Sequence, residues 1–148
     1  MLSSLSGRQH TVYTGVTLVL PHARDPKSGQ TPLTREFWEA TKVQFAKLEQ
    51  ESIHAYVASG EPMGKAGAYG IQGTGGSFVK GINGCYFNVM GFPVHRFAEE
   101  VDTLIKAGYL ESSWECGYLE GIFWVHGSLG RNGGRDSYVR LLGRFLVV

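Results

Sequence analysis

The sequence predicts a mixed α/β fold, in which strands and helices follow one another along a single chain of 148 residues. Residues 10–21 are rich in valine and threonine and partly alternate, as in a strand, whereas residues 93–108 carry apolar side chains at helical spacing. Hydrophobic content of 43% and charged content of 18% are typical of a globular protein. A chain of this length can form one domain with its own core.

Two strands are predicted in the first third of the chain. Residues 10–21 (HTVYTGVTLVLP) form the first strand, which ends at Pro21, and residues 22–32 read as a polar loop. Residues 36–48 (EFWEATKVQFAKL) are ambiguous between helix and strand. Because ATKVQFA alternates in the manner of a strand, we favour a strand over residues 41–45.

A helix and a hairpin are predicted next. Ile53, Tyr56 and Val57 lie at helical spacing and indicate a short helix over residues 49–59, with Gly60 at a position where helices often stop. Further along, SFVKGING (residues 77–84) resembles a strand that closes on an Asn-Gly turn, the commonest hairpin dipeptide.

A second short strand is therefore predicted over residues 85–89. Pro93 suits the first turn of a helix, and an apolar stripe then continues to Gly108, which predicts a helix there. Beyond Leu110 the sequence has no sustained period, although residues 138–148 (YVRLLGRFLVV) are compatible with one more strand or helix.

Charge and hydropathy exclude several classes of partner. The net charge of +1 offers no strong field toward nucleic acid or an anionic membrane. No apolar run reaches the roughly 18 residues needed to cross a bilayer, and the first ten residues lack the apolar stretch of a signal peptide. Cys85 and Cys116 form no pair with metal-ligand spacing. We therefore expect a cytoplasmic protein that binds neither nucleic acid nor membrane.

The glycine-rich segment 59–76 (SGEPMGKAGAYGIQGTGG) is the strongest candidate for a site. A phosphate-binding P-loop is excluded because Gly60 and Gly64 are separated by three residues rather than four, and because Ala66 follows Lys65 where serine or threonine is needed. A dinucleotide-binding loop also lacks its third glycine. Taken alone, the glycines are explained most simply as tight turns.

Polar side chains among these glycines favour a nucleotide pocket. Glu61 can bind a metal or orient a lysine, Lys65 can neutralise phosphate, and Gln72 can donate and accept hydrogen bonds as recognition of a base edge requires. Tyr69 lies between them. For Glu61 and Lys65 taken individually, a solvated surface position is slightly favoured over a site.

Three blocks of the sequence resemble the Maf family of nucleoside triphosphate pyrophosphatases. They are LSGRQHTVYTGVTL (residues 5–18), EATKVQF (residues 39–45) and SGEPMGKAGAYGIQGTGGSFVKGINGCYFNVMGFPV (residues 59–94), in the family's order. The chain is also similar to the Maf half of the acetylserotonin O-methyltransferase-like protein of animals. On this resemblance residues 1–110 are the C-terminal portion of a Maf-like domain, and residues 111–148 are an unassigned tail.

The resemblance implies a two-lobed, mixed-sheet Maf-like fold, incomplete in this chain. It implies hydrolysis of dTTP- or UTP-type nucleotides to the monophosphate and pyrophosphate, with Mg²⁺ or Mn²⁺ as the divalent cation. Gln72 matches the substrate-selecting glutamine, and Tyr69 and Gly70 belong to the same substrate-binding motif. Lys65, supported by Glu61, is the catalytic candidate.

Departures from the family pattern keep a second function open. The family's serine-arginine phosphate loop and its aspartate general base have no counterpart before Met1, and Gly64 stands where aspartate usually precedes the motif lysine. The alternative is therefore a catalytically impaired isoform that acts as a nucleotide-binding or interaction fragment. The expected partners are a nucleoside triphosphate and, as an open alternative, a second copy of the chain in a homodimer.

Overall fold

The computed structural model describes residues 1–110, 115–119, 122–126 and 140–147. Its contacts divide the chain into two compact units. The first contains Met1–Thr14, Trp38–Val94 and Arg144–Val148, and the second contains Gly15–Phe37 and His95–Gly143. The candidate site lies entirely within the first unit.

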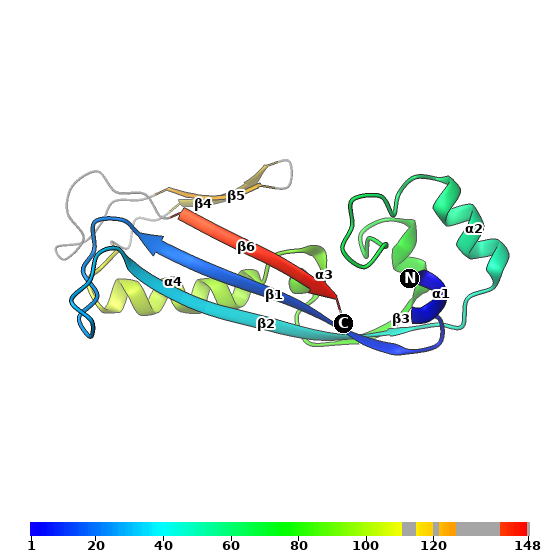
Figure 1. Cartoon of the computed structure of the whole chain (residues 1–148), viewed down its shortest axis with the longest axis horizontal. Helices are drawn as coiled ribbons and strands as arrows, with labels where there is room; N and C mark the ends of the chain where they lie inside the picture. Colours follow the sequence, from blue (N-terminus) through cyan, green and yellow to red (C-terminus); the bar gives the residue numbers. More distant parts are fainter. Residues whose placement is uncertain (111–114, 120–121, 127–139, 148) are drawn as a thin grey trace. The chain divides into compact units, whose positions relative to one another are not determined.

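The helices and strands follow the order drawn in Figure 1. They are α1 (Leu2–Leu5), β1 (Gln9–Leu20), β2 (Leu33–Phe45), α2 (Gln50–Ala58), the 3-10 helix η1 (Thr74–Phe78), β3 (Val79–Asn83), α3 (Tyr86–Met90), α4 (Val94–Lys106), β4 (Glu115–Leu119), β5 (Ile122–His126) and β6 (Arg140–Val147). The mixed α/β class predicted from the sequence is confirmed.

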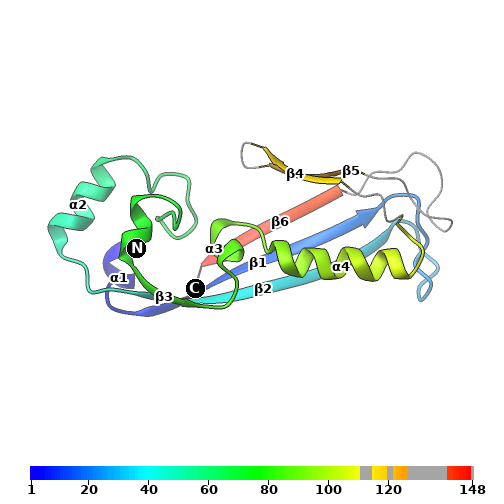
Figure 2. The same cartoon turned by 180° about the vertical axis from the view of Figure 1, so that it is seen from behind.

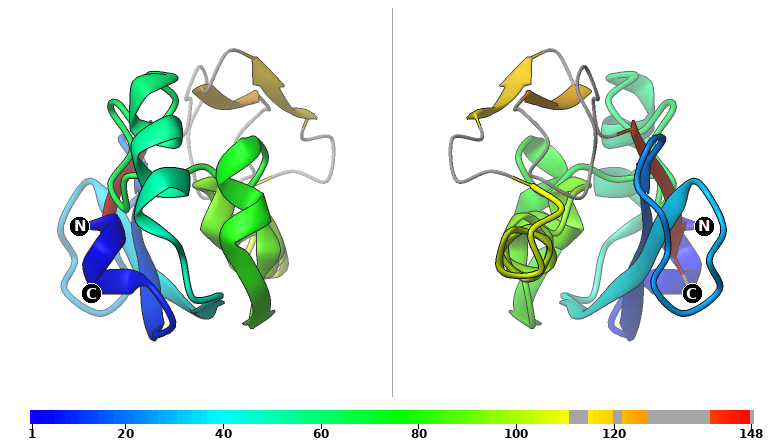
Figure 3. Two further views of the ribbon diagram at one scale, coloured as in Figure 1. Left: turned by 90° about the vertical axis from the view of Figure 1, so that its right-hand side faces the viewer. Right: turned by 90° about the vertical axis from the view of Figure 1, so that its left-hand side faces the viewer.

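Four strands form one sheet in the order β3-β2-β1-β6, and β4 and β5 pair antiparallel in a second sheet. Figures 2 and 3 show the first sheet from behind and nearly end-on. β2 pairs antiparallel with β3, from Lys42 opposite Asn83 to Phe45 opposite Val79, with an irregularity in register between Gln44 and Phe45. Along β1 every second residue is buried, which is the pattern of a strand with one face on a core.

The core of the first unit is built around aromatic side chains. Phe45 of β2 packs edge-on against Tyr69, with ring centroids 4.8 Å apart, and Tyr56 of α2 packs edge-on against Phe78 at 5.0 Å. Edge-to-face pairs of this kind add about 0.5–1.5 kcal/mol beyond the burial of their area. The glycine-rich segment is therefore attached to the core through Tyr69 rather than lying free on the surface.

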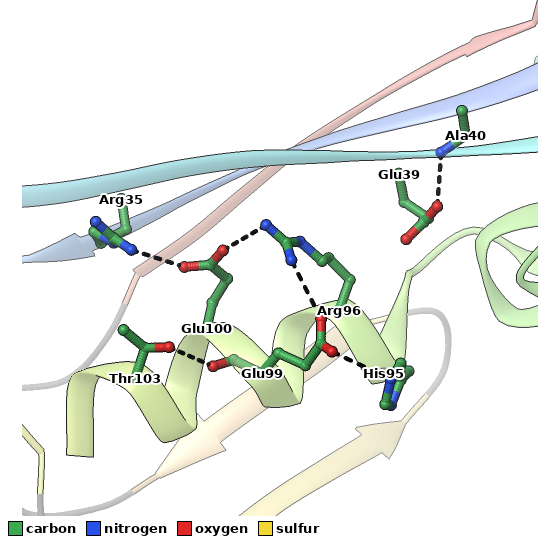
Figure 4. A network of polar contacts seen from close by, with 8 residues as sticks. All are labelled: Arg35, Glu39, Ala40, His95, Arg96, Glu99, Glu100 and Thr103. Atoms are coloured by element: carbon green, nitrogen blue, oxygen red, sulfur yellow. Dashed lines mark hydrogen bonds and ion pairs between the residues drawn. The ribbon is translucent and has the colours of Figure 1, made fainter. Parts of the chain in front are cut away.

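In the second unit, a buried carboxylate links α4 to β2 (Figure 4). Glu100 lies between two guanidinium groups, with Arg35 of β2 at 3.1 Å and Arg96 of α4 at 2.9 Å. Phe97 and Leu104 on the same helix are buried. Two cations around one carboxylate satisfy its oxygens, which makes burial of the charge tolerable. Among the described residues, no helix is both long enough and apolar enough to cross a membrane.

Several predicted elements are confirmed, and one is wrong. The predicted strand at residues 10–21 is β1, and the helix at residues 49–59 is α2. The helix after Pro93 is α4. The strand predicted at residues 41–45 is longer, because β2 begins at Leu33.

The predicted strand over residues 85–89 and its Asn-Gly hairpin are wrong, because residues 86–90 form the helix α3. The helical turn carries Asn88 to a buried position where its Nδ2 donates to the Val12 carbonyl at 3.0 Å and to Thr41 Oγ1 at 3.1 Å. These tertiary contacts override the local turn signal. The tail segment compatible with a strand or a helix contains the strand β6, and the rest of that segment lies outside the described residues.

Candidate functional site

A cavity of about 290 Å³ opens beside the glycine-rich segment. Its wall is formed by residues 64–67 and 69–72, by Val12 of β1 and by residues 89–91 at the end of α3. Four of the five predicted site residues, Lys65, Tyr69, Gly70 and Gln72, line it together. Glu61, the fifth, is not part of the lining.

Tyr69 is fixed at the back of the cavity. It is buried, and its hydroxyl lies 2.9 Å from Nε2 of the equally buried His10. Burial raises the pKa of Tyr69 to about 12 and lowers the pKa of His10. Both groups are therefore neutral near pH 7, and Tyr69, hydrogen-bonded to His10, contributes an uncharged side chain to the cavity lining.

Gly70 allows a close approach between the backbone and a lysine. A side chain at this position would place its Cβ 2.6 Å from Cε of Lys65, so the lysine stem lies directly on the glycine. The Lys65 ammonium donates to the Glu61 carbonyl at 2.5 Å. Lys65 is exposed, and its ammonium retains two further N–H groups that can reach an anion.

Gln72 is exposed at the cavity wall. Within the part of the chain that the structure describes, no side-chain hydrogen bond engages its amide group. An amide offers two N–H donors and one oxygen acceptor, so this group can recognise the polar edge of a ligand without first breaking an internal contact.

The Glu61 carboxylate is bound inside the loop. Its Oε1 accepts from the Tyr56 hydroxyl at 3.0 Å and from the Gly75 N–H at 3.2 Å, and its Oε2 accepts from the Thr74 N–H at 3.1 Å. The Gly75 N–H and the other donors hold the pKa of this carboxyl below its usual value. The sequence suggested that Glu61 could orient a lysine. Glu61 does contact Lys65, but through the Glu61 backbone carbonyl and not through the carboxylate.

Three further polar residues around the site were missed from the sequence. His10 and Asn88 are buried beside the cavity residues Tyr69 and Val12, and Tyr56 reaches Glu61. His10 falls on the same face of β1 as Val12, so a polar residue in an inward position of the strand was a usable signal. Tyr56 lies in the apolar stripe of α2 and is indistinguishable from a core residue in the sequence.

The resemblance implies a divalent cation, and the described residues were compared with what such an ion needs. No group of three or more His, Cys, Asp or Glu side chains gathers at one place in these ranges. The carboxylate closest in sequence to the cavity residues, that of Glu61, already accepts three hydrogen bonds. Because Mg²⁺ at nucleotide sites is usually held by one or two carboxylates together with substrate phosphates and waters, dependence on Mg²⁺ or Mn²⁺ stays a prediction.

The described residues form an α/β protein with a cavity beside a glycine-rich loop. Residues 1–104 match the family model described as Maf-like protein, so the chain belongs to this family.

Named relatives share this region. The chain is 53% identical over 102 residues to the dTTP/UTP pyrophosphatase of Carboxydothermus hydrogenoformans, a match that covers 68% of this chain and 50% of the relative. It is 47% identical over 109 residues to the dTTP/UTP pyrophosphatase of Pelotomaculum thermopropionicum, which covers 74% and 51%. A human protein named "Probable bifunctional dTTP/UTP pyrophosphatase/methyltransferase protein" is 46% identical over 109 residues, covering 74% of this chain and 17% of the relative. The chain thus spans about half the length of the two bacterial relatives.

Proposed function

We propose that this chain binds dTTP or UTP in the cavity beside residues 64–72 and serves in their hydrolysis to the monophosphate and pyrophosphate. The observation that carries the proposal is that Lys65, Tyr69, Gly70 and Gln72 line one cavity. The names of the bacterial relatives, which are 47–53% identical in this region, supply the substrate class.

Each of these residues has a distinct role in the proposal. Lys65 is the phosphate-binding cation, because its ammonium can donate to anionic oxygens. Gln72 selects the pyrimidine by donating and accepting at the base edge. Gly70 leaves room for the stem of Lys65 against the loop backbone, and the buried Tyr69 forms part of the cavity wall.

A noncatalytic nucleotide-binding chain is the second candidate function. Hydrolysis of a triphosphate needs a group that orients the attacking water. The cavity wall among the described residues contains no carboxylate and no imidazole, and His10 behind it is bonded to Tyr69. We derive no step through a divalent cation. Dependence on Mg²⁺ or Mn²⁺, a homodimer and a cytoplasmic location stay predictions.

Calorimetric titration of the full chain with UTP, dTTP and ATP tests the binding proposal. We expect both pyrimidine nucleotides to bind more tightly than ATP. Equal affinities, or no heat of binding for any of the three, would refute it. Measurement of pyrophosphate release from UTP with added Mg²⁺ then separates the two candidates, because the noncatalytic chain binds without turnover.

A further inference from the structure

The side chains of Tyr56 and Glu61 bind each other and the backbone of the glycine-rich segment between Gly70 and Gly75. Tyr56 lies near the end of α2 and is 3% exposed, and its hydroxyl donates to Glu61 Oε1 at 3.0 Å. The same hydroxyl oxygen accepts the Gly70 N–H at 3.2 Å. We name this pair the Tyr56–Glu61 clasp.

The clasp holds both ends of one turn. The Tyr56 hydroxyl binds the backbone at Gly70, and the Glu61 carboxylate binds the N–H groups of Thr74 and Gly75. The stretch between these anchors contains Gln72, which lines the cavity. The position of Gln72 is therefore set by two side chains that do not themselves line the cavity.

Two glycines of the turn, Gly73 and Gly75, leave the space that the side chains of Glu61 and Tyr56 occupy. A Cβ at Gly73 would overlap Oε1 of Glu61, and a Cβ at Gly75 would lie 2.5 Å from the Tyr56 hydroxyl. Real Cβ atoms do not approach other atoms this closely, so a larger residue at either position must displace the clasp. The clasp therefore accounts for the glycines at positions 73 and 75.

A carboxylate suits this position because it only accepts hydrogen bonds. Oε1 receives two donors and Oε2 receives one, so three N–H or O–H groups converge on one charge. An amide in its place would turn an NH₂ group toward one of these donors and lose at least one contact. Hydrogen bonds to a charged group are also roughly twice as strong as those between neutral groups.

We propose that Tyr56 and Glu61 are positioning residues that hold the turn of residues 70–75, and so set how strongly Gln72 discriminates between nucleobases. This inference rests on the proposed function and assigns Glu61 a role in specificity instead of direct catalysis.

The test compares four variants of the full chain. Tyr56→Phe removes only the hydroxyl, and Glu61→Gln keeps the size of the side chain while changing its donors and acceptors. Tyr13→Phe and Glu51→Gln are the matched controls, because both residues are exposed and lie outside the cavity lining. Circular dichroism confirms that each variant is folded, and Tyr56→Phe alone carries the test if Glu61→Gln does not fold.

Two measurements follow for each folded variant. The ratio of ATP to UTP dissociation constants reports base discrimination, and we expect it to fall about tenfold in each clasp variant, the equivalent of one charge-assisted hydrogen bond. Amide hydrogen exchange by NMR, without nucleotide, reports the turn itself. We expect the Gly70, Thr74 and Gly75 amides to exchange about tenfold faster in the clasp variants and unchanged in the controls.

The outcomes separate the proposals. Unchanged exchange at these amides overturns the clasp. Faster exchange with an unchanged ATP-to-UTP ratio shows a structural role only and overturns the role in specificity. If the unmodified chain binds no nucleotide, the proposed function and the specificity role both fail, whereas the exchange rates still decide whether the clasp holds the turn.

Discussion

Replacing Asn88 by alanine should destabilise the first unit by about 2 kcal/mol. Asn88 is fully buried, and its Nδ2 makes two short hydrogen bonds, to the Val12 carbonyl and to Thr41 Oγ1. At about 1 kcal/mol each these contribute about 2 kcal/mol, and the space left by the amide costs about 1 kcal/mol more. The Asn88 Oδ1 has no partner among the described residues, so its removal returns about 1 kcal/mol.

Urea denaturation followed by circular dichroism measures this change. With a denaturant slope of about 2 kcal/mol per molar, the midpoint should fall by about 1 M. Asn83→Ala, in the exposed strand β3, is the control and should leave the midpoint within about 0.2 M, since surface substitutions usually stay within about 0.5 kcal/mol. If both variants shift the midpoint equally, the buried amide is not what holds α3 against β1 and β2.

Three further predictions concern the site. Gln72→Ala should reduce the preference for UTP over ATP by about 1–3 kcal/mol, measured as the ratio of dissociation constants, whereas Gln50→Ala at the exposed start of α2 should not. Lys65→Ala should weaken UTP and ATP binding by similar factors in the same titration, because a lysine reads phosphate rather than base; a change confined to one nucleotide would contradict this role. Burial lowers the pKa of His10 below the ordinary 6.5, so the unfolded chain binds the proton more readily and stability should fall as pH drops below about 6.5. His10→Gln should flatten this dependence in thermal melts between pH 5 and 7, and an unchanged slope would count against it.

Elements with strong periodic patterns could be predicted from the sequence. The alternation of β1 reflects burial of one face, and every second residue of that strand is buried in the structure. In the apolar stripe of α4, Phe97 and Leu104 are buried, and the polar Glu100 is buried beside them. The start of β2 was missed because residues 34–36 are all exposed, so that part of the strand shows no alternation. α3 was missed because its helical form depends on Asn88 reaching β1 and β2, which are distant in sequence.

Part of the candidate site could be predicted from the sequence, and part could not. Lys65, Tyr69, Gly70 and Gln72 were identified from a local motif, and the structure brings them to one cavity. The role of Glu61 could not be derived from the sequence, because its carboxylate binds Thr74 and Gly75, which are 13 and 14 residues further along the chain. Contacts of this range have no signature in local spacing.

The edge strand β3 bears on how the chain resists aggregation. β3 stands at one end of the sheet order and is only five residues long, and the register of its partner β2 is irregular beside it. A short, irregular edge offers few consecutive free N–H and C=O groups to a strand of another molecule. Lys80 is exposed on this strand, and its charge would face a like charge if two copies paired in register. These features make this edge a poor template for intermolecular sheet growth.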